Sequence, residues 1–225
     1  MDERDALLAT IFANNVDDVP RLVYADWLDE HGEPAQAGFI RAQCAYALTE
    51  PQSDDNIEHW HDVLAWWERL KHEWRYELAG LWKVDATWFR RGFLDRMLTL
   101  GADQFVEMAA DWWPRMPVRK VLLELSPWTV VELAGCEELS RLSELALRGQ
   151  DPHGSVIPVL AECPYLSGLR VLDLTEFQLG IEAIEALTRS RVLGNLTHLR
   201  LPYFMRPNRE GGRLLKRRFG DACEF

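Results

Sequence analysis

Three six-residue segments decide the fold of this chain: LSELAL at residues 142–147, LRVLDL at 169–174 and LTHLRL at 196–201. Each has the pattern Leu-x-x-Leu-x-Leu, and each lies 27 residues after the one before it. Residues i and i+2 of a strand point to the same side. The last two leucines of each segment therefore enter a core, while the residue between them faces outwards. The pattern predicts three short strands in equivalent positions of a repeat.

The repeat extends beyond these strands. The same offset relates leucines upstream of each segment, namely Leu133, Leu160 and Leu187, and then Leu139, Leu166 and Leu193. It also relates three small residues, Cys136, Cys163 and Ser190. A small, weakly polar side chain is expected there, packed where each helix ends against the sheet, so we interpret the two cysteines as inert packing residues.

Two weaker units precede the three strong ones. They carry the Leu-x-Leu strands at residues 98–100 and 123–125. Strand-helix units of this length are typical of the α/β type of leucine-rich repeat. Helices are expected to start at Asp103, Ser126, Ser155 and Ile181. We predict an α/β fold in which a helical N-terminal module precedes a short solenoid of five parallel strands, centred on Thr99, Glu124, Ala146, Asp173 and Arg200.

The N-terminal residues 1–82 lack the leucine repeat and are predicted to be helical throughout. Apolar residues at steps of three and four predict helices over 5–14, from Asp17 or Asp18 to Gly32, over 37–48 and over 56–81. The expected organisation is a helical module at 1–50, an aromatic-rich helix and connection at 51–87, the repeats at 88–205, and a basic C-terminal cap at 206–225.

Part of this helical region resembles a known family. The run VPRLVYADWLDEHG at residues 19–32, followed by GFIRAQ at 38–43, is similar to the repeat-companion domain, a short N-terminal module of bacterial proteins that commonly precedes leucine-rich repeats. WFRRGF at 88–93 and RFGD at 218–221 also resemble members of that group. The loop between Gly32 and Gly38 is longer than the family's usual form. The resemblance covers most of the chain and implies an interaction protein without an established activity.

Composition and motifs narrow the function classes. The formal net charge is −11, so the surface as a whole should repel nucleic acid and anionic membranes. The chain shows neither a signal peptide nor an apolar run approaching the roughly 18 residues of a membrane span, which predicts a cytoplasmic protein. The catalytic motifs GxSxG, Walker A, GxGxxG and HExxH do not occur, and the four cysteines form no CxxC pair. We expect no enzyme activity, no cofactor and no metal site.

The outward residues of the predicted strands form the first candidate site, on the concave face of the solenoid. They are Leu122, Glu124, Glu144, Val171, Asp173, His198 and Arg200. Glu124, Glu144 and Asp173 are predicted to form a ladder of like charges on successive strands. A partner segment with basic and apolar side chains would relieve that repulsion, whereas an ordinary solvated sheet is the alternative.

Two further sets are candidates. Arg21, Tyr24, Asp26 and Arg41 in the N-terminal module are either a docking site or intramodule salt bridges. The basic residues after 205 either cap the last repeat or contact nucleic acid; the cap is favoured because a solenoid must cover its last repeat. The expected function is a protein-binding scaffold or recognition subunit, and the alternatives are an inhibitor or regulator of an enzyme, or nucleic-acid contact through the tail.

Overall fold

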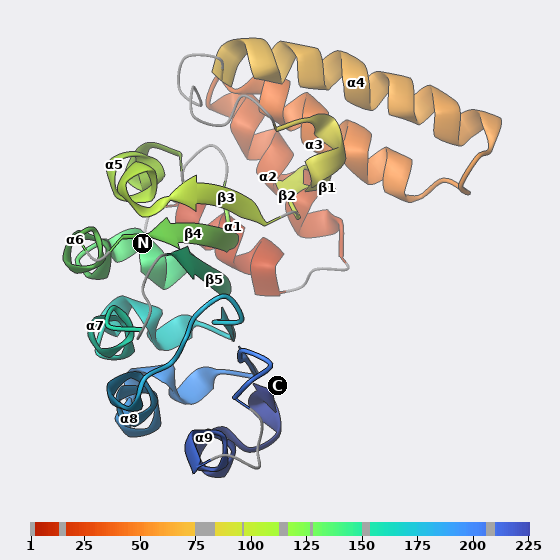
Figure 1. Cartoon of the computed structure of the whole chain (residues 1–225). Helices are drawn as coiled ribbons and strands as arrows, with labels where there is room; N and C mark the ends of the chain where they lie inside the picture. Colours follow the sequence, from red (N-terminus) through yellow and green to blue (C-terminus); the bar gives the residue numbers. More distant parts are fainter. Residues whose placement is uncertain are drawn as a thin grey trace. The chain divides into compact units, whose positions relative to one another are not determined.

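The computed structural model describes residues 3–13, 17–74, 84–95, 97–112, 117–126, 128–149, 154–205 and 210–225. It is an α/β structure with an N-terminal helical region and a six-stranded parallel sheet (Figure 1). The chain divides into two compact units, Met1–Arg96 with Pro114–Pro117, and Met97–Trp113 with Val118–Phe225. We call them the helical unit and the sheet unit.

The helical unit contains four long helices in the predicted places. They are α1 (Glu3–Ala13), α2 (Val19–Glu30), α3 (Pro34–Ala47) and α4 (Asp54–Trp74). The third helix begins earlier than predicted because Pro34, whose φ is already suited to a first turn, starts it. The predicted continuation of the fourth helix over 75–81 lies outside the described residues.

A β-hairpin completes the helical unit, and sequence reasoning missed it. A short 3-10 helix, η2 (Ala86–Trp88), leads into β1 (Phe89–Arg90), which pairs antiparallel with β2 (Phe93–Leu94). Arg91 and Gly92 both have positive φ, 53° and 84°, as a tight two-residue hairpin turn requires. These residues, assigned above to the start of the repeats, belong instead to the helical unit.

Buried side chains of the helices and the hairpin form one core. Gln43 of α3 ties the hairpin to the helices, since its amide donates to the Ala86 carbonyl at 3.1 Å and accepts from the Gly92 N–H at 2.8 Å. A Cβ on Gly92 would lie only 2.4 Å from Ile40, so this turn requires glycine for space as well as for φ. The core residues are Leu8, Ile11, Tyr24, Ala25, Leu28, Ala37, Ile40, Cys44 and Phe93.

The sheet unit has six parallel strands in sequence order. They are β3 (Leu98–Gly101), β4 (Lys120–Leu125), β5 (Glu144–Gly149), β6 (Val171–Asp173), β7 (His198–Arg200) and β8 (Cys223–Glu224). The five predicted strands and their parallel pairing are confirmed. The sixth strand, in the segment predicted only as a cap, was missed; it pairs with β7 through Leu199 and Cys223.

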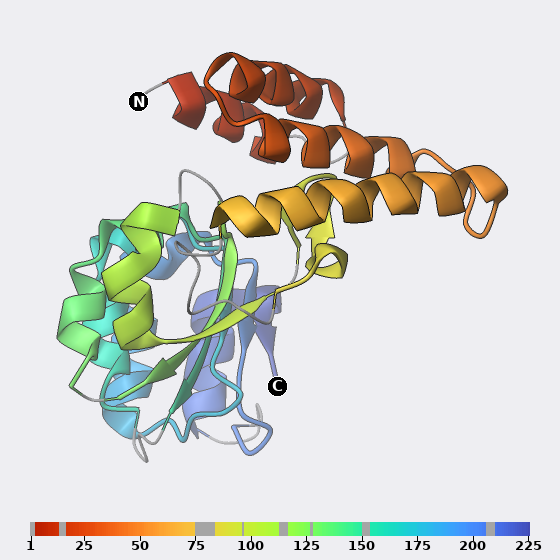
Figure 2. The same ribbon diagram turned by 90° about the horizontal axis from the view of Figure 1, so that it is seen from above.

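A helix follows each of the first five strands and lies on one side of the sheet (Figure 1). The helices are α5 (Ala102–Trp112), α6 (Val130–Ala134), α7 (Ile157–Ala161), α8 (Ile181–Arg189) and α9 (Glu210–Phe219). In the view from above in Figure 2, the strands of the sheet lie one behind another. Short 3-10 helices η3 (Glu137–Arg141), η4 (Pro164–Gly168) and η5 (Val192–Asn195) return the chain to the next strand, and η6 (Gly220–Ala222) precedes β8.

Two predicted helix starts were wrong. Ser126 does not cap α6, which begins at Val130 after the N-cap Thr129. Ser155 does not cap α7, whose N-cap is Val156. In both cases a turn separates the strand from the helix. Pro127, which was expected in the first turn of α6, lies outside the described residues.

The small residues of the repeat link neighbouring units of the sheet. Cys163 donates its S–H to the Ala134 carbonyl at 3.3 Å, and Ser190 donates its O–H to the Ala161 carbonyl at 2.6 Å. Each acceptor is the last residue of the helix in the preceding repeat unit, α6 for Cys163 and α7 for Ser190. Both donors and Cys136 are buried. Burial raises the pKa of the Cys136 thiol to about 12, which favours the protonated thiol at neutral pH.

Candidate functional site

The face of the sheet away from the helices carries the candidate site, and the strand pairing arranges its side chains in three rows. The first row contains Lys120, Glu144, Val171 and His198. The second contains Thr99, Leu122, Ala146, Asp173, Arg200 and Glu224. The third contains Gly101, Glu124 and Arg148. We call this surface the outer face.

The predicted acidic ladder is wrong. Glu124, Glu144 and Asp173 stand in three different rows, because Glu124 pairs with Arg148, Glu144 with Lys120 and Val171, and Asp173 with Ala146. The strand Lys120–Leu125 alternates apolar residues without interruption, and a shift of two residues leaves the same side chains buried. Alternation therefore determines which residues point outwards but leaves the register of this strand open.

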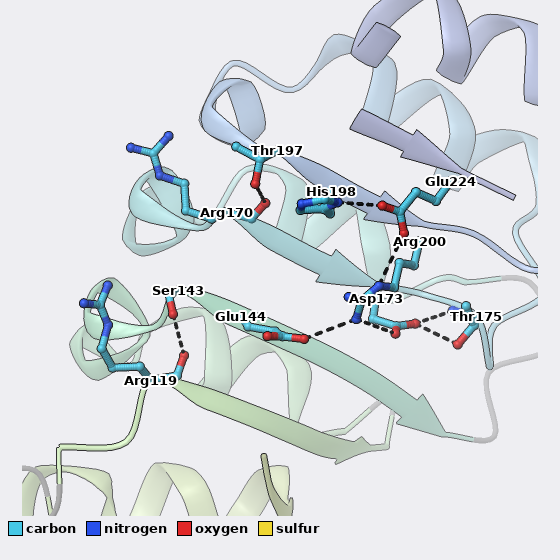
Figure 3. Close-up of polar contacts among 10 residues, drawn as sticks. All are labelled: Arg119, Ser143, Glu144, Arg170, Asp173, Thr175, Thr197, His198, Arg200 and Glu224. Atoms are coloured by element: carbon cyan, nitrogen blue, oxygen red, sulfur yellow. Dashed lines mark hydrogen bonds and ion pairs between the residues drawn. The ribbon is translucent and has the colours of Figure 1, made fainter. Parts of the chain in front are cut away.

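Five charged or titratable residues meet at the end of the outer face formed by β5 to β8; we call them the Arg200 cluster (Figure 3). Arg200 Nη1 lies 3.2 Å from Glu144 Oε1 and 3.5 Å from Asp173 Oδ2. Its Nε lies 3.5 Å from Glu224 Oε2. Nδ1 of His198, the fifth member, lies 2.5 Å from Glu224 Oε1. One guanidinium is thus shared by three carboxylates.

The members of the cluster differ in exposure. The side chains of Glu144 and Asp173 are 17% and 20% exposed, whereas those of Glu224 and His198 are 46% and 50% exposed. Asp173 also accepts hydrogen bonds from the N–H and the hydroxyl of Thr175, at 3.0 and 2.7 Å. Two carboxylates are therefore held in the sheet surface, and the outermost pair is open to solvent.

The pKa values follow this arrangement. Partial burial acts to lower the pKa of Arg200, but Glu144 and Asp173 raise it by more, so the guanidinium stays charged. The hydrogen bond from His198 holds the pKa of Glu224 below its usual range. With His198 neutral, three carboxylates and one guanidinium leave two negative charges in excess.

Apolar side chains adjoin this charge. Leu122 and Val171 are half-buried, while Ala146 between their strands is buried. Lys120 and Arg148 also lie on the outer face, beside Glu144 and Glu124 respectively. Sequence reasoning missed Lys120, Arg148 and Glu224 as members of this face. The signal for Glu224 is only the apolar-polar-apolar run Cys223-Glu224-Phe225.

The predicted docking set of the helical unit does not come together. Arg21 and Tyr24 are buried, and Nη1 of Arg21 donates to the Asp17 carbonyl at 2.5 Å. Arg41 lies at the surface and pairs with Asp26 at 2.6 Å and with Asp29 at 2.7 Å. Of the two alternatives, the intramodule salt bridge is found for Asp26 and Arg41, whereas Arg21 and Tyr24 are buried. The bridge joins α2 and α3, and such a surface contact orients helices but adds little stability.

The basic C-terminal helix both packs and exposes charge. Leu215 of α9 is fully buried, and Arg218 donates to the Ser190 carbonyl at 3.1 Å. Arg213, Lys216 and Arg217 are exposed, and Lys216 Nζ lies 3.4 Å from Asp221 Oδ1. One side of α9 packs against α8 and β8, while Arg213, Lys216 and Arg217 face water.

Comparisons of the chain with models of known families, with curated proteins and with solved structures found no match. In the part of the chain that the structure describes, no helix is long and apolar enough to cross a membrane. Within the same residues, no group of three or more histidine, cysteine or acidic side chains is placed to hold a metal ion. The chemistry that the outer face itself offers is the binding of a cation, by exposed carboxylate oxygens, next to apolar surface.

Proposed function

We propose that this chain is a non-catalytic protein-binding scaffold or recognition subunit that binds a partner through the outer face of its sheet. The partner segment carries basic and apolar side chains. The observation that carries the proposal is the Arg200 cluster, in which one guanidinium serves three carboxylates beside the half-buried Leu122 and Val171.

Charge and apolar area act together in this proposal. A lysine or arginine of the partner that reaches Glu224 would neutralise part of the excess negative charge, and the neighbouring carboxylates would add attraction over a few ångströms. Aliphatic contacts with Leu122 and Val171 would remove apolar surface from water. Because Glu144 and Asp173 already pair with Arg200, they orient the site, and Glu224 offers the open contact.

The proposal includes the architecture. The leucine positions repeat every 27 residues, Cys163 and Ser190 bond to the helix of the preceding unit, and the strands follow in sequence order. These features support a leucine-rich-repeat solenoid whose concave side is the outer face. The helical unit, with its VPRLVYADWLDEHG run in α2, is proposed as a repeat-companion module of a bacterial protein.

The test is a pull-down from the native host with mass spectrometry, using the unaltered chain, Glu224→Lys and Glu162→Lys. Glu162 is exposed at the end of α7, on the side of the sheet away from the outer face. Glu162→Lys therefore makes the same charge change at a position outside the proposed contact surface. A protein held by the unaltered chain and by Glu162→Lys, but bound about tenfold more weakly by Glu224→Lys, supports the proposal. Equal retention by all three would contradict it.

Two alternatives use observed features. An inhibitor or regulator of an enzyme would bind through the same outer face, and the captured protein would then be an enzyme whose activity falls on binding. Nucleic-acid contact is favoured by the exposed Arg213, Lys216 and Arg217 of α9. A gel shift that disappears as salt is raised, and that is weakened by Arg213→Ala with Arg217→Ala, would identify that second mode.

A further inference from the structure

A hollow opens at the carboxyl ends of β4 and β5, away from the Arg200 cluster. It lies in the sheet unit, and it combines an indole with three charged side chains. Its lining residues are Glu124, Leu125, Ser126, Trp128, Arg148, Gly149 and Glu176.

Trp128 is the unusual member. Its exposed fraction is 86%, the largest among the exposed large hydrophobic residues of the described chain. The residue lies in the turn between β4 and α6, outside the leucine core. An indole held in water keeps a large apolar and electron-rich surface available, which suits stacking with a planar cation.

The charges around the indole favour a cation over an anion. Arg148 Nη2 lies 3.7 Å from Glu176 Oε1, so these two largely compensate each other. Glu124 is exposed and lies level with Arg148 on the neighbouring strand, and the described residues give its carboxylate no ion pair. Two carboxylates against one guanidinium leave one negative charge in excess. This charge would repel a phosphate, and it would not attract a neutral sugar.

We propose that this hollow binds an arginine side chain of a protein partner. The guanidinium stacks on the Trp128 indole and pairs with the Glu124 carboxylate. Arginine fits better than lysine because its planar, weakly hydrated group stacks on an aromatic face and presents two donors to a carboxylate at once. The inference extends the proposed function to a second contact point and rests on it only in taking the partner to be a protein.

The experiment uses the full chain with nitrogen-15-labelled tryptophan and three tripeptide amides as probes. They are acetyl-Gly-Arg-Gly, its citrulline analogue, which keeps the shape but lacks the charge, and acetyl-Gly-Lys-Gly. The chain has ten tryptophans. The indole N–H resonance of Trp128 is therefore assigned by its loss in Trp128→Phe.

The arginine peptide is expected to shift the Trp128 resonance in a saturable way. Its affinity should be about fivefold higher than that of the lysine peptide, and the citrulline peptide should cause no shift. Glu124→Gln should weaken arginine binding about fivefold. Tyr203→Ala, which removes another exposed aromatic of the sheet unit, serves as the matched control and should leave it unchanged.

Two results would overturn the inference. One is a Trp128 resonance that does not move at a concentration of arginine peptide that saturates the shifts of other resonances. The other is an equal shift of the Trp128 resonance with the citrulline peptide. Glu224→Lys separates this inference from the proposed function, because it alters the Arg200 cluster and changes none of the residues that line the hollow. Loss of partner capture in Glu224→Lys without any arginine effect on Trp128 would retain the proposed function and reject the hollow. A saturable arginine effect on Trp128, with partner capture unchanged in Glu224→Lys, would retain the hollow and reject the proposed function.

Discussion

The two units bury their side chains in different ways. The helical unit relies on single aromatic contacts between distant parts of the chain, such as Phe39 of α3 with Trp67 of α4 and Phe89 of β1, at 5.5 and 5.3 Å between ring centroids. The sheet unit repeats the same leucine, strand after strand: Leu145, Leu172 and Leu199 are level with each other and buried. Damage should spread through the first core but remain between neighbouring strands in the second.

The largest expected effect tests the aromatic core. Phe39 is fully buried, so Phe39→Ala should destabilise the helical unit by about 3–5 kcal/mol. Hydrogen exchange followed by mass spectrometry should rise over all four helices, α1 to α4. Leu22→Ala, at an exposed position of the same unit, is the control and should change stability by about 0.5 kcal/mol or less. Exchange confined to α3 and α4 would contradict the shared core.

A smaller effect tests the leucine core. Leu172→Ala should cost about 2–5 kcal/mol, because it leaves a cavity between the sheet and its helices. Exchange should rise most in β5, β6 and β7, since strands in sequence order contact only their neighbours. Val131→Ala, at an exposed position on α6, should have little effect on the thermal melt. An unchanged melt for Leu172→Ala would show that the assigned register of the leucines is wrong.

The links between units of the sheet should matter less than its leucines. Ser190→Ala removes the bond to the Ala161 carbonyl and the acceptor of the Leu193 N–H, which should cost about 1–2 kcal/mol in urea denaturation. Ser140→Ala removes an exposed hydroxyl bonded to the Glu137 carbonyl and should cost far less. Ser190→Cys, which restores the residue type found at 136 and 163, should recover part of the loss. Equal effects of the two alanine variants would refute the linking role.

The smallest effect concerns pH. The pKa of Glu224 is lowered in the folded chain from its usual 4.5 by the hydrogen bond from His198. The resulting stability is present above the unfolded pKa and is lost as pH falls through the folded pKa. The difference in unfolding free energy between the unaltered chain and Glu224→Gln should therefore shrink as urea denaturation is repeated at pH values falling below 4.5. A difference independent of pH, or one unaffected by His198→Gln, would contradict this account.

Some features could be predicted from sequence because each depended on a local rule. The buried side of each strand followed from the alternation of leucines, as at Leu145 and Leu147. The helix α8 began where the apolar steps predicted, at Ile181. Cys163 and Ser190 could be aligned because their 27-residue offset is visible in the chain. The helix starts at 126 and 155 failed because turn residues lie between each serine and the first helical residue, so another residue holds the N-cap position.

The features of the candidate site also divide into those that a local rule predicts and those that it does not. The outward position of Glu144, Asp173 and Arg200 was predictable, since strand geometry alone sets it. Their meeting was not, because Arg200 reaches Glu144 across two strand gaps, and that contact depends on register. The hairpin at Arg91 and Gly92 was likewise missed, since its short strands acquire stability from contact with Gln43 and the helical core.

The sequence by itself determined which residues of the sheet unit are buried, because a period of two separates the sides of a strand and a 27-residue repeat aligns one strand with the next. Tertiary structure alone decided the register of β4 and the pairing of β8 with β7, and the pairing of β8 brings Glu224 to Arg200. Alternation is unchanged by a slip of two residues, and the energy that selects one register comes from backbone pairing and packing between strands. Backbone pairing and packing between strands therefore determine which charges meet on the outer face.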